Sequence, residues 1–147
     1  MTLGLVGDVG GTNGRFALVD LKEVRQTHTW PTAQLPSLPA IAHHFGFHDR
    51  KPDFACIAVA APVNGPAVTL TNARVRLDVG TLDVPRARLA NDLEAAAAGV
   101  VDVPDSLRDV VVPGVRHPER PTLVVGLGTG LGAVSYTHLT LPTTPYV

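Results

Sequence analysis

Short apolar runs separated by glycine and proline dominate the start of the chain, and they predict strands. Leu3 to Val6 and Phe16 to Val19 are two such runs, and the turn residues at positions 10–14 between them favour a strand hairpin. Weak alternation over Val24 to Trp30 predicts a third strand, which Pro31 closes. We therefore expect the chain to open with three consecutive strands.

The next apolar positions change to helical spacing and then to a continuous run. Leu38, Ile41 and Phe45 follow Ser37 at this spacing, which predicts a short helix over residues 38–45 with the serine hydroxyl as its cap. The run from Phe54 to Ala60 is apolar throughout, which is typical of a strand that is buried on both faces. Because such strands belong to parallel sheets, its neighbours should be parallel to it.

The later part of the chain continues the alternation of strands and helices. Arg88 to Ala90 predicts a strand, and Asn91-Asp92 leads from it into Leu93 to Val100, which contains four successive alanines and predicts a helix. Four shorter apolar runs predict further strands: Val68 to Leu70, Val75 to Leu77, Asp109 to Val112 and Thr122 to Val125. The sum is an α/β domain with an initial hairpin followed by alternating helices and strands.

Composition and charge narrow the class of protein. The chain has 147 residues, 45% of them hydrophobic and 17% charged, which suits one globular domain. A net charge of −1 without charge blocks gives no sign of a nucleic-acid partner or of an anionic membrane surface. Cys56 is the single cysteine, and no apolar run reaches the length of a membrane span. With no signal-peptide pattern at the start, we expect a cytoplasmic protein.

The end of the chain differs in composition from the rest. No Asp, Glu, Lys or Arg occurs from Pro121 to Val147. Residues 134–143, VSYTHLTLPT, resemble the translation of a transposon-derived sequencing adapter. We therefore expect a domain over residues 1–133 and a non-native tail over residues 134–147. The competing interpretation is a threonine-rich terminal strand.

The first motif with possible chemistry is the run from Asp8 to Asn13 within the hairpin. Gly10 and Gly11 remove the Cβ atoms that would keep an anion away, free the backbone for positive φ, and let successive N–H groups face one concavity. Thr12 and Asn13 add side-chain donors, and Asp8 could hold a hydrated Mg²⁺. A plain tight turn would explain the same residues.

The second motif is the glycine-rich run from Gly126 to Gly132 after an apolar strand. It does not fit the dinucleotide fingerprint, which would need glycine at Leu131, and it lacks the lysine of a P-loop. A turn that approaches a phosphate is possible at Gly128, Thr129 and Gly130, with a further strand after it.

The third motif is Asn91-Asp92, between a strand and an alanine-rich helix. The helix dipole stabilises a carboxylate at this end as the anion, so Asp92 could accept a proton from a substrate hydroxyl. The competing interpretation is structural, because Asn and Asp are also common helix caps.

Together, two glycine-rich turns separated by a strand, Asn-Asp and a helix resemble the sugar kinase and actin superfamily. More narrowly, the chain resembles the bacterial glucokinase family from Leu3 to Ala133, through the successive runs GDVGGTNGRFAL, IAVAAPVNGPAVTLTN, LANDLEAAAAG and VVGLGTGLGAV. The resemblance implies the mixed sheet of an RNase H-like, actin-like ATPase domain. It also implies that ATP with Mg²⁺ phosphorylates the 6-hydroxyl of glucose or a related hexose, in a parent protein that could be a homodimer.

The resemblance assigns roles to individual residues. Asp92 matches the catalytic base, and Asn91 matches a neighbour that binds sugar hydroxyls. Asn64 and Asn72 match loop positions near the sugar. The positions that match the two phosphate motifs are Asp8, Gly10, Gly11, Thr12, Asn13, Gly128, Thr129 and Gly130.

The sequence also departs from the family pattern. Residues 77–89 are too short for the helix that usually precedes the Asn-Asp strand, and Pro85 disfavours a replacement helix. An alanine, Ala73, follows Thr71-Asn72 where the family often has an aromatic residue. Family members are about twice as long, and their second half supplies a Glu-His pair, another Glu and the adenine pocket. We therefore expect this chain alone to have little or no kinase activity.

Two other functions compete with a kinase. A sugar-responsive regulator of the ROK type would carry a helix-turn-helix ahead of the first motif, which already begins at Gly7. A non-catalytic nucleotide-binding protein of the actin-like superfamily would not need Asp92. A metal site at His43, His44 and His48 is disfavoured, because no acidic or cysteine partner lies at ligand spacing.

Overall fold

The computed structural model describes residues 2–20, 23–48, 50–70, 73–100, 102–115, 117, 120–127 and 131–136. The chain divides into two compact units, Met1–Asp92 and Leu93–Val147.

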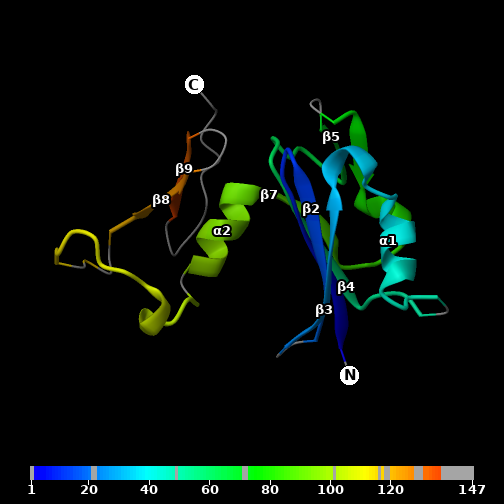
Figure 1. Ribbon diagram of the computed structural model, residues 1–147, viewed down its shortest axis with the longest axis horizontal. Helices are drawn as coiled ribbons and strands as arrows, with labels where there is room; N and C mark the ends of the chain where they lie inside the picture. The colour runs from blue at the N-terminus through cyan, green and yellow to red at the C-terminus, as the bar shows by residue number, and fades with distance from the viewer. Residues whose placement is uncertain are drawn as a thin grey trace. The chain divides into compact units, whose positions relative to one another are not determined.

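A five-stranded mixed sheet forms the centre of the first unit (Figure 1). Its strands are β1 (Leu3–Val9), β2 (Asn13–Asp20), β3 (Val24–Pro31), β4 (Phe54–Val59) and β7 (Ala87–Asn91). Their spatial order is β3-β2-β1-β4-β7. The first three strands are antiparallel, whereas β4 is parallel to both β1 and β7. The predicted hairpin, third strand and parallel central strand are confirmed.

The first hairpin is longer than the sequence predicts. Strand β1 continues through Gly7 and Asp8, and its register with β2 runs from Leu3 opposite Asp20 to Val9 opposite Gly14. Gly7 lies inside the strand opposite Phe16, whose ring leaves no room for a side chain: a Cβ atom on Gly7 would lie 2.6 Å from Cε1 of Phe16. The turn is therefore shorter than the predicted residues 10–14.

Helix α1 (Leu38–His44) begins and ends as the sequence predicts. The Ser37 hydroxyl accepts a hydrogen bond from the N–H of Ala40, at 3.4 Å. Beyond the helix, Gly46 adopts a φ of +87°, and the N–H of Phe47 returns to the carbonyl of Ala42 at 3.1 Å. This is the left-handed termination that glycine favours.

The hydrophobic core of the first unit is formed by residues of the five-stranded sheet, of α1 and of the segment from residue 70 to residue 84. Helix α1 contributes Leu38 and Ile41, and the sheet contributes Leu5, Phe16 and Ile57. The hairpin of β5 (Ala67–Leu70) and β6 (Val75–Asp78) supplies Leu70 and Leu77 to the same core.

A 3-10 turn, η2 (Val79–Leu82), lies in the segment where the family resemblance implies a helix. Asp78 caps this turn by accepting a hydrogen bond from the N–H of Gly80, and Val79 and Leu82 are buried in the core. The described segment from residue 73 to residue 91 contains no α-helix, which agrees with the expectation that residues 77–89 are too short for one.

The second unit contains most of α2 (Asp92–Val100), the short turn η3 (Asp105–Leu107) and a hairpin of β8 (Thr122–Leu127) and β9 (Leu131–Tyr136). Gly126 and Gly132 are register partners in this hairpin, and both lie against Leu93. Cβ atoms on them would lie 2.8 Å and 2.5 Å from the Leu93 methyl carbons. These two glycines therefore make room for the helix.

One predicted strand is wrong. Asp109 to Val112 is irregular in the structure, and Val110, Val111 and Val112 have exposed fractions of 78%, 88% and 81%. β-branched residues favour a strand only where a neighbouring strand accepts their hydrogen bonds and covers a face. In the part of the chain that the structure describes, this run pairs with no strand.

Two further observations concern the chain as a whole. No helix among the described residues is long and apolar enough to cross a membrane. Strand β9 continues to Tyr136 and thus includes three residues of the stretch 134–147. The non-native origin of that stretch stays a prediction.

Candidate active site

The carboxyl ends of three parallel strands meet at one edge of the sheet. Val9, Val59 and Asn91 are register partners across β1, β4 and β7. Neighbouring strands lie about 4.8 Å apart, so the ends of β1 and β7 are separated by about 10 Å. Ligands of α/β sheets bind outside this edge. The register therefore places the turn after β1 and the Asn-Asp step after β7 at the edge where a ligand would bind.

The chain that leaves β4 connects these two ends. The N–H of Ala60 donates to the carbonyl of Val9 at 3.0 Å, and the side-chain amide of Asn91 donates to the carbonyl of Ala61 at 3.2 Å. Two successive residues thus hold β1 on one side and β7 on the other. This bridge fixes the spacing of the candidate site.

The turn between β1 and β2 consists of Gly11 and Thr12, between Gly10 and Asn13. The N–H of Gly10 donates to the carbonyl of Asn13 at 2.9 Å and closes the turn. Among the described residues, no acceptor is bonded to the N–H of Gly11 or of Thr12. Two adjacent donors without a protein partner are suited to bind an anion.

The glycines of this turn act differently from the sequence prediction. Neither Gly10 nor Gly11 has positive φ, because among the described glycines only Gly46 and Gly65 do. Instead, a Cβ atom on Gly11 would meet nothing within 4 Å, and one on Gly10 would meet only the carbonyl of Asn13, at 3.7 Å. The two glycines leave open space beside the N–H groups, which a bulky anion needs.

Asn91 and Asp92 lie where the strand changes into the helix. Asn91 is the last residue of β7, and Asp92 is the first residue of α2, as the sequence predicts. Both are half-buried, and Asp92 also has an interaction with the protein. The Asp92 carboxylate thus lies at the amino end of α2, next to the carboxyl end of β7.

Asn64 is exposed in the loop between β4 and β5. Gly65 follows it with a φ of +143°, a conformation that only glycine adopts readily. The other predicted site residues, Asn72, Gly128, Thr129 and Gly130, lie outside the described residues.

Asp8 is suited to bind Mg²⁺ as a single carboxylate ligand. Its side chain is exposed at the second-last position of β1, beside the turn. The described residues contain no cluster of three or more His, Cys, Asp or Glu side chains that could hold a metal by themselves. Mg²⁺ commonly uses one or two carboxylates together with waters and substrate phosphates, so a single carboxylate here is sufficient.

Two ion pairs of the first unit lie at the opposite, amino edge of the sheet. The N–H of Leu3 donates to Asp53, which with Arg50 holds the pKa of that carboxyl below its usual value. Lys51 likewise lowers the pKa of Asp83 by a hydrogen bond. These groups stabilise the fold and are remote from the candidate site.

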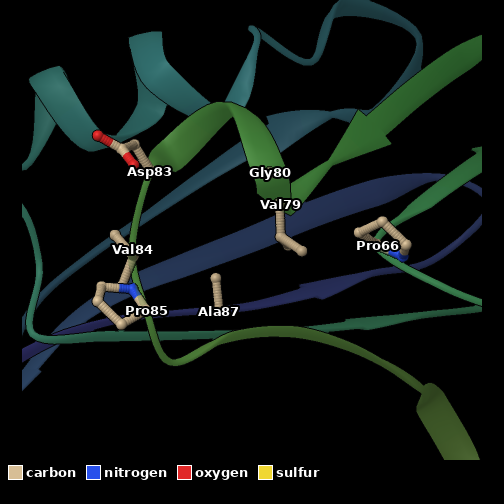
Figure 2. Close-up of a pocket in the computed structure, with 7 residues that line it drawn as sticks. All are labelled: Pro66, Val79, Gly80, Asp83, Val84, Pro85 and Ala87. Carbon is tan, nitrogen blue, oxygen red and sulfur yellow. The ribbon is translucent and has the colours of Figure 1, made fainter.

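A shallow pocket of about 290 Å³ lies at this amino side as well (Figure 2). Its walls are mainly apolar and come from Pro66, Val79, Gly80, Asp83, Val84, Pro85 and Ala87. Figure 2 shows the Asp83 carboxylate directed away from Val79 and Ala87. Ala87 begins β7, whereas Asn91 ends it, so the pocket and the candidate site belong to opposite ends of that strand.

Thr32, which no sequence motif indicated, is fully buried and contacts the turn after β1. In the sequence, nothing distinguishes Thr32 except its position after Pro31, the residue that ends β3. No local pattern shows that this hydroxyl reaches a residue more than twenty positions away.

The mixed five-stranded sheet, with the turn after β1 and the Asn-Asp step at its carboxyl edge, has the actin-like ATPase fold, to which sugar kinases belong. The glucokinase family model matches residues 5–143. The chain belongs to the glucokinase family.

Curated relatives agree with this assignment. The chain is 35% identical to a glucokinase of Yersinia pestis over 140 residues, and 31% identical to one of Photorhabdus laumondii over 136 residues. These alignments cover 89% and 88% of this chain but 43% and 42% of the relatives. The chain therefore spans less than half the length of the curated relatives that it matches.

Solved structures show the same fold. A glucokinase from an Antarctic psychrotroph matches with a TM-score of 0.77 and 29% identity, over 97% of this chain and 49% of that one. A Balamuthia mandrillaris glucokinase in complex with glucose matches with a TM-score of 0.67 and 23% identity, over 94% of this chain and 45% of that one. A ROK family glucokinase from Streptomyces griseus, in complex with glucose and AMPPNP, has a TM-score of 0.60 at 19% identity, over 97% and 47% of the two chains.

Proposed function

We propose that this chain carries two parts of the active site of an ATP-dependent glucokinase. They are the catalytic base and the phosphate turn, which consists of residues 10–13 at the junction of β1 and β2. The reaction transfers the γ-phosphoryl group of ATP to the 6-hydroxyl of glucose. Membership of the glucokinase family supports the activity. The observation that carries the assignment of residues is the row of Val9, Val59 and Asn91, which brings both motifs to the carboxyl edge of the sheet.

The phosphate part of the proposal rests on the turn after β1. The N–H groups of Gly11 and Thr12 would donate to phosphate oxygens of ATP, with Asn13 as a further donor. Mg²⁺, held by Asp8 through water, would supply positive charge to the phosphate oxygens when bound. Gly128, Thr129 and Gly130 complete the proposal as the second phosphate turn, on the basis of the family resemblance.

The sugar part of the proposal rests on the step from β7 to α2. Asp92 would accept the proton of the 6-hydroxyl while the hydroxyl oxygen attacks the γ-phosphorus. Asn91 would hold a neighbouring sugar hydroxyl, and Asn64 and Asn72 would approach the sugar from the loop after β4 and from the turn after β5. Phosphoryl transfer depends mainly on such positioning, which a rigid strand end provides.

A kinase of this type would act in the cytoplasm, where ATP and free hexose occur together. ATP and glucose are then the small-molecule partners that we propose.

A chimaera tests the proposed function. Residues 1–133 of this chain replace the matching part of the Yersinia pestis relative, and glucose-dependent ADP formation is measured. In an active chimaera, we expect Asp92→Asn to lower the rate about 10²- to 10⁴-fold, the usual contribution of a general base. Glu94→Gln, two residues further along α2, is the matched control and should leave the rate unchanged.

Equal rates for Asp92→Asn and the unmodified chimaera would contradict the assignment of the base. A chimaera that binds ATP but forms no ADP with glucose would favour a non-catalytic nucleotide-binding protein instead.

A further inference from the structure

Thr32 makes two hydrogen bonds to the phosphate turn from outside it. Its Oγ1 donates to the carbonyl of Gly10 at 2.8 Å, and its backbone N–H donates to the carbonyl of Thr12 at 2.9 Å. The side chain is fully buried, and among the described residues it is the only buried polar one. One residue thus binds the carbonyl groups on both sides of Gly11.

These bonds determine where the donors of the turn point. A trans peptide unit is planar, and its C=O and N–H groups point in opposite directions. All described peptide bonds are trans. Because the Gly10 carbonyl points at Thr32, the N–H of Gly11 in the same unit must point away from Thr32. That N–H is one of the two donors without a protein acceptor.

Thr32 is itself held in place by the turn that follows β3. It begins the 3-10 turn η1 (Thr32–Gln34), and the N–H of Leu35 donates to its carbonyl at 3.2 Å. Leu35 in turn packs on Gly14, where a Cβ atom would lie 2.8 Å from Cδ1 of Leu35. The hydroxyl therefore approaches the phosphate turn from a fixed position.

We propose that Thr32 is a positioning residue that orients the N–H of Gly11 toward the phosphates of the nucleotide. This inference rests on the proposed function, because it assumes that the turn binds phosphate. Thr32 does not touch the nucleotide and acts only through the peptide unit of Gly10 and Gly11. A purely structural hydrogen bond would stabilise the fold but would leave the direction of that N–H and its affinity for phosphate unchanged.

The experiment uses the full 147-residue chain and three variants. Thr32→Val removes the hydroxyl at nearly constant volume, and Thr32→Ser retains it. Thr81→Val is the matched control, because Thr81 also donates its hydroxyl to a carbonyl, that of Asp78 at 2.6 Å, but in η2. Backbone order parameters are measured by NMR without nucleotide, and affinity is measured by titration with MgATP.

We expect Thr32→Val to lower the Gly11 order parameter from about 0.85 to below about 0.6 and to weaken MgATP binding about tenfold. Thr32→Ser should restore both values, and Thr81→Val should change neither. An unchanged Gly11 order parameter in Thr32→Val would overturn the positioning role. Unchanged MgATP affinity together with a lowered order parameter would overturn it as well.

The two hypotheses fail in different ways. If the chimaera with the Yersinia pestis relative, which supplies the second half, does not bind MgATP while Thr32→Val still loosens Gly11, the orienting role of Thr32 is supported and the proposed phosphate site is contradicted.

Discussion

The side-chain amide of Asn91 donates a hydrogen bond to the backbone carbonyl of Ala61, with 3.2 Å between nitrogen and oxygen. This contact ties the carboxyl end of β7 to the chain that leaves β4. Because Ala60 bonds to Val9 in the same stretch, the two proposed halves of the active site share one support. A change at Asn91 should therefore affect stability as well as sugar binding.

We expect Asn91→Ala to lower the free energy of unfolding by about 1–2 kcal/mol, since it leaves a partly buried carbonyl without its donor. Urea unfolding followed by the fluorescence of Trp30, the single tryptophan of the chain, measures this change. Asn64→Ala removes an exposed amide for which no hydrogen bond is found among the described residues, and it should have almost no effect. Equal losses in the two variants would contradict the role of the Ala61 contact.

The carboxylate of Asp53 should make stability depend on pH in the acid range. The N–H of Leu3, and then Arg50, lower its pKa in the folded state. A lowered folded pKa stabilises the protein above the unfolded value of about 3.9, and this stabilisation is lost as the pH falls through the folded pKa. The difference in melting temperature between the wild type and Asp53→Asn should therefore be present at neutral pH and shrink below about pH 4.

Asp109→Asn provides the control for the acid range, because Asp109 is exposed and has no ion pair among the described residues. Its melting temperature should follow that of the wild type at every pH. A gap between wild type and Asp53→Asn that stays constant through the acid range would contradict the pKa argument.

Gly7 and Gly99 should respond to alanine in opposite directions. The Cβ atom of Gly7→Ala would lie 2.6 Å and 2.8 Å from atoms of the Phe16 ring, so we expect a loss of about 1–3 kcal/mol. In helix α2, a Cβ atom on Gly99 would meet nothing within 4 Å, so Gly99→Ala should stabilise the helix by about 0.5–1 kcal/mol. Urea unfolding by circular dichroism measures both, and a stabilising Gly7→Ala would show that the ring contact is not tight.

Kinase activity of the chain alone is a further test. From the family resemblance, the adenine pocket and several sugar-binding residues come from a second half, and the chain covers 43% of its Yersinia pestis relative. We expect no glucose-dependent ADP release by the purified chain, measured in a coupled assay with the full-length relative as the positive control. Turnover by the chain that is lost in Asp92→Asn would show that the second half is dispensable.

Local signals in the sequence predicted most elements of the first unit. The continuous apolar run at 54–60 correctly indicated a central strand with parallel neighbours, because only strands covered on both faces lack polar positions. Ser37 and the spacing after it correctly located α1. By contrast, the valines at 110–112 have strand propensity but no partner strand among the described residues, and the prediction was wrong.

Non-local pairing could not be predicted from the sequence. The motifs identified Asn91 and the glycine turn as separate candidates, but only the register of β1, β4 and β7 shows that they share one edge. The predicted strand ended at Val6, because nothing near Gly7 in sequence reveals the Phe16 ring above it. The contact from Thr32 to Gly10 was missed for the same reason.

The most direct test of the central claim is an NMR titration of the chain, in which backbone amide shifts are recorded during separate additions of MgATP and glucose. We expect MgATP to shift the amides of Gly11 and Thr12 most strongly and glucose to shift those of Asn91 and Asp92. Shifts from both ligands confined to the amino edge of the sheet, around Asp53 and the pocket beside Ala87, would contradict this claim.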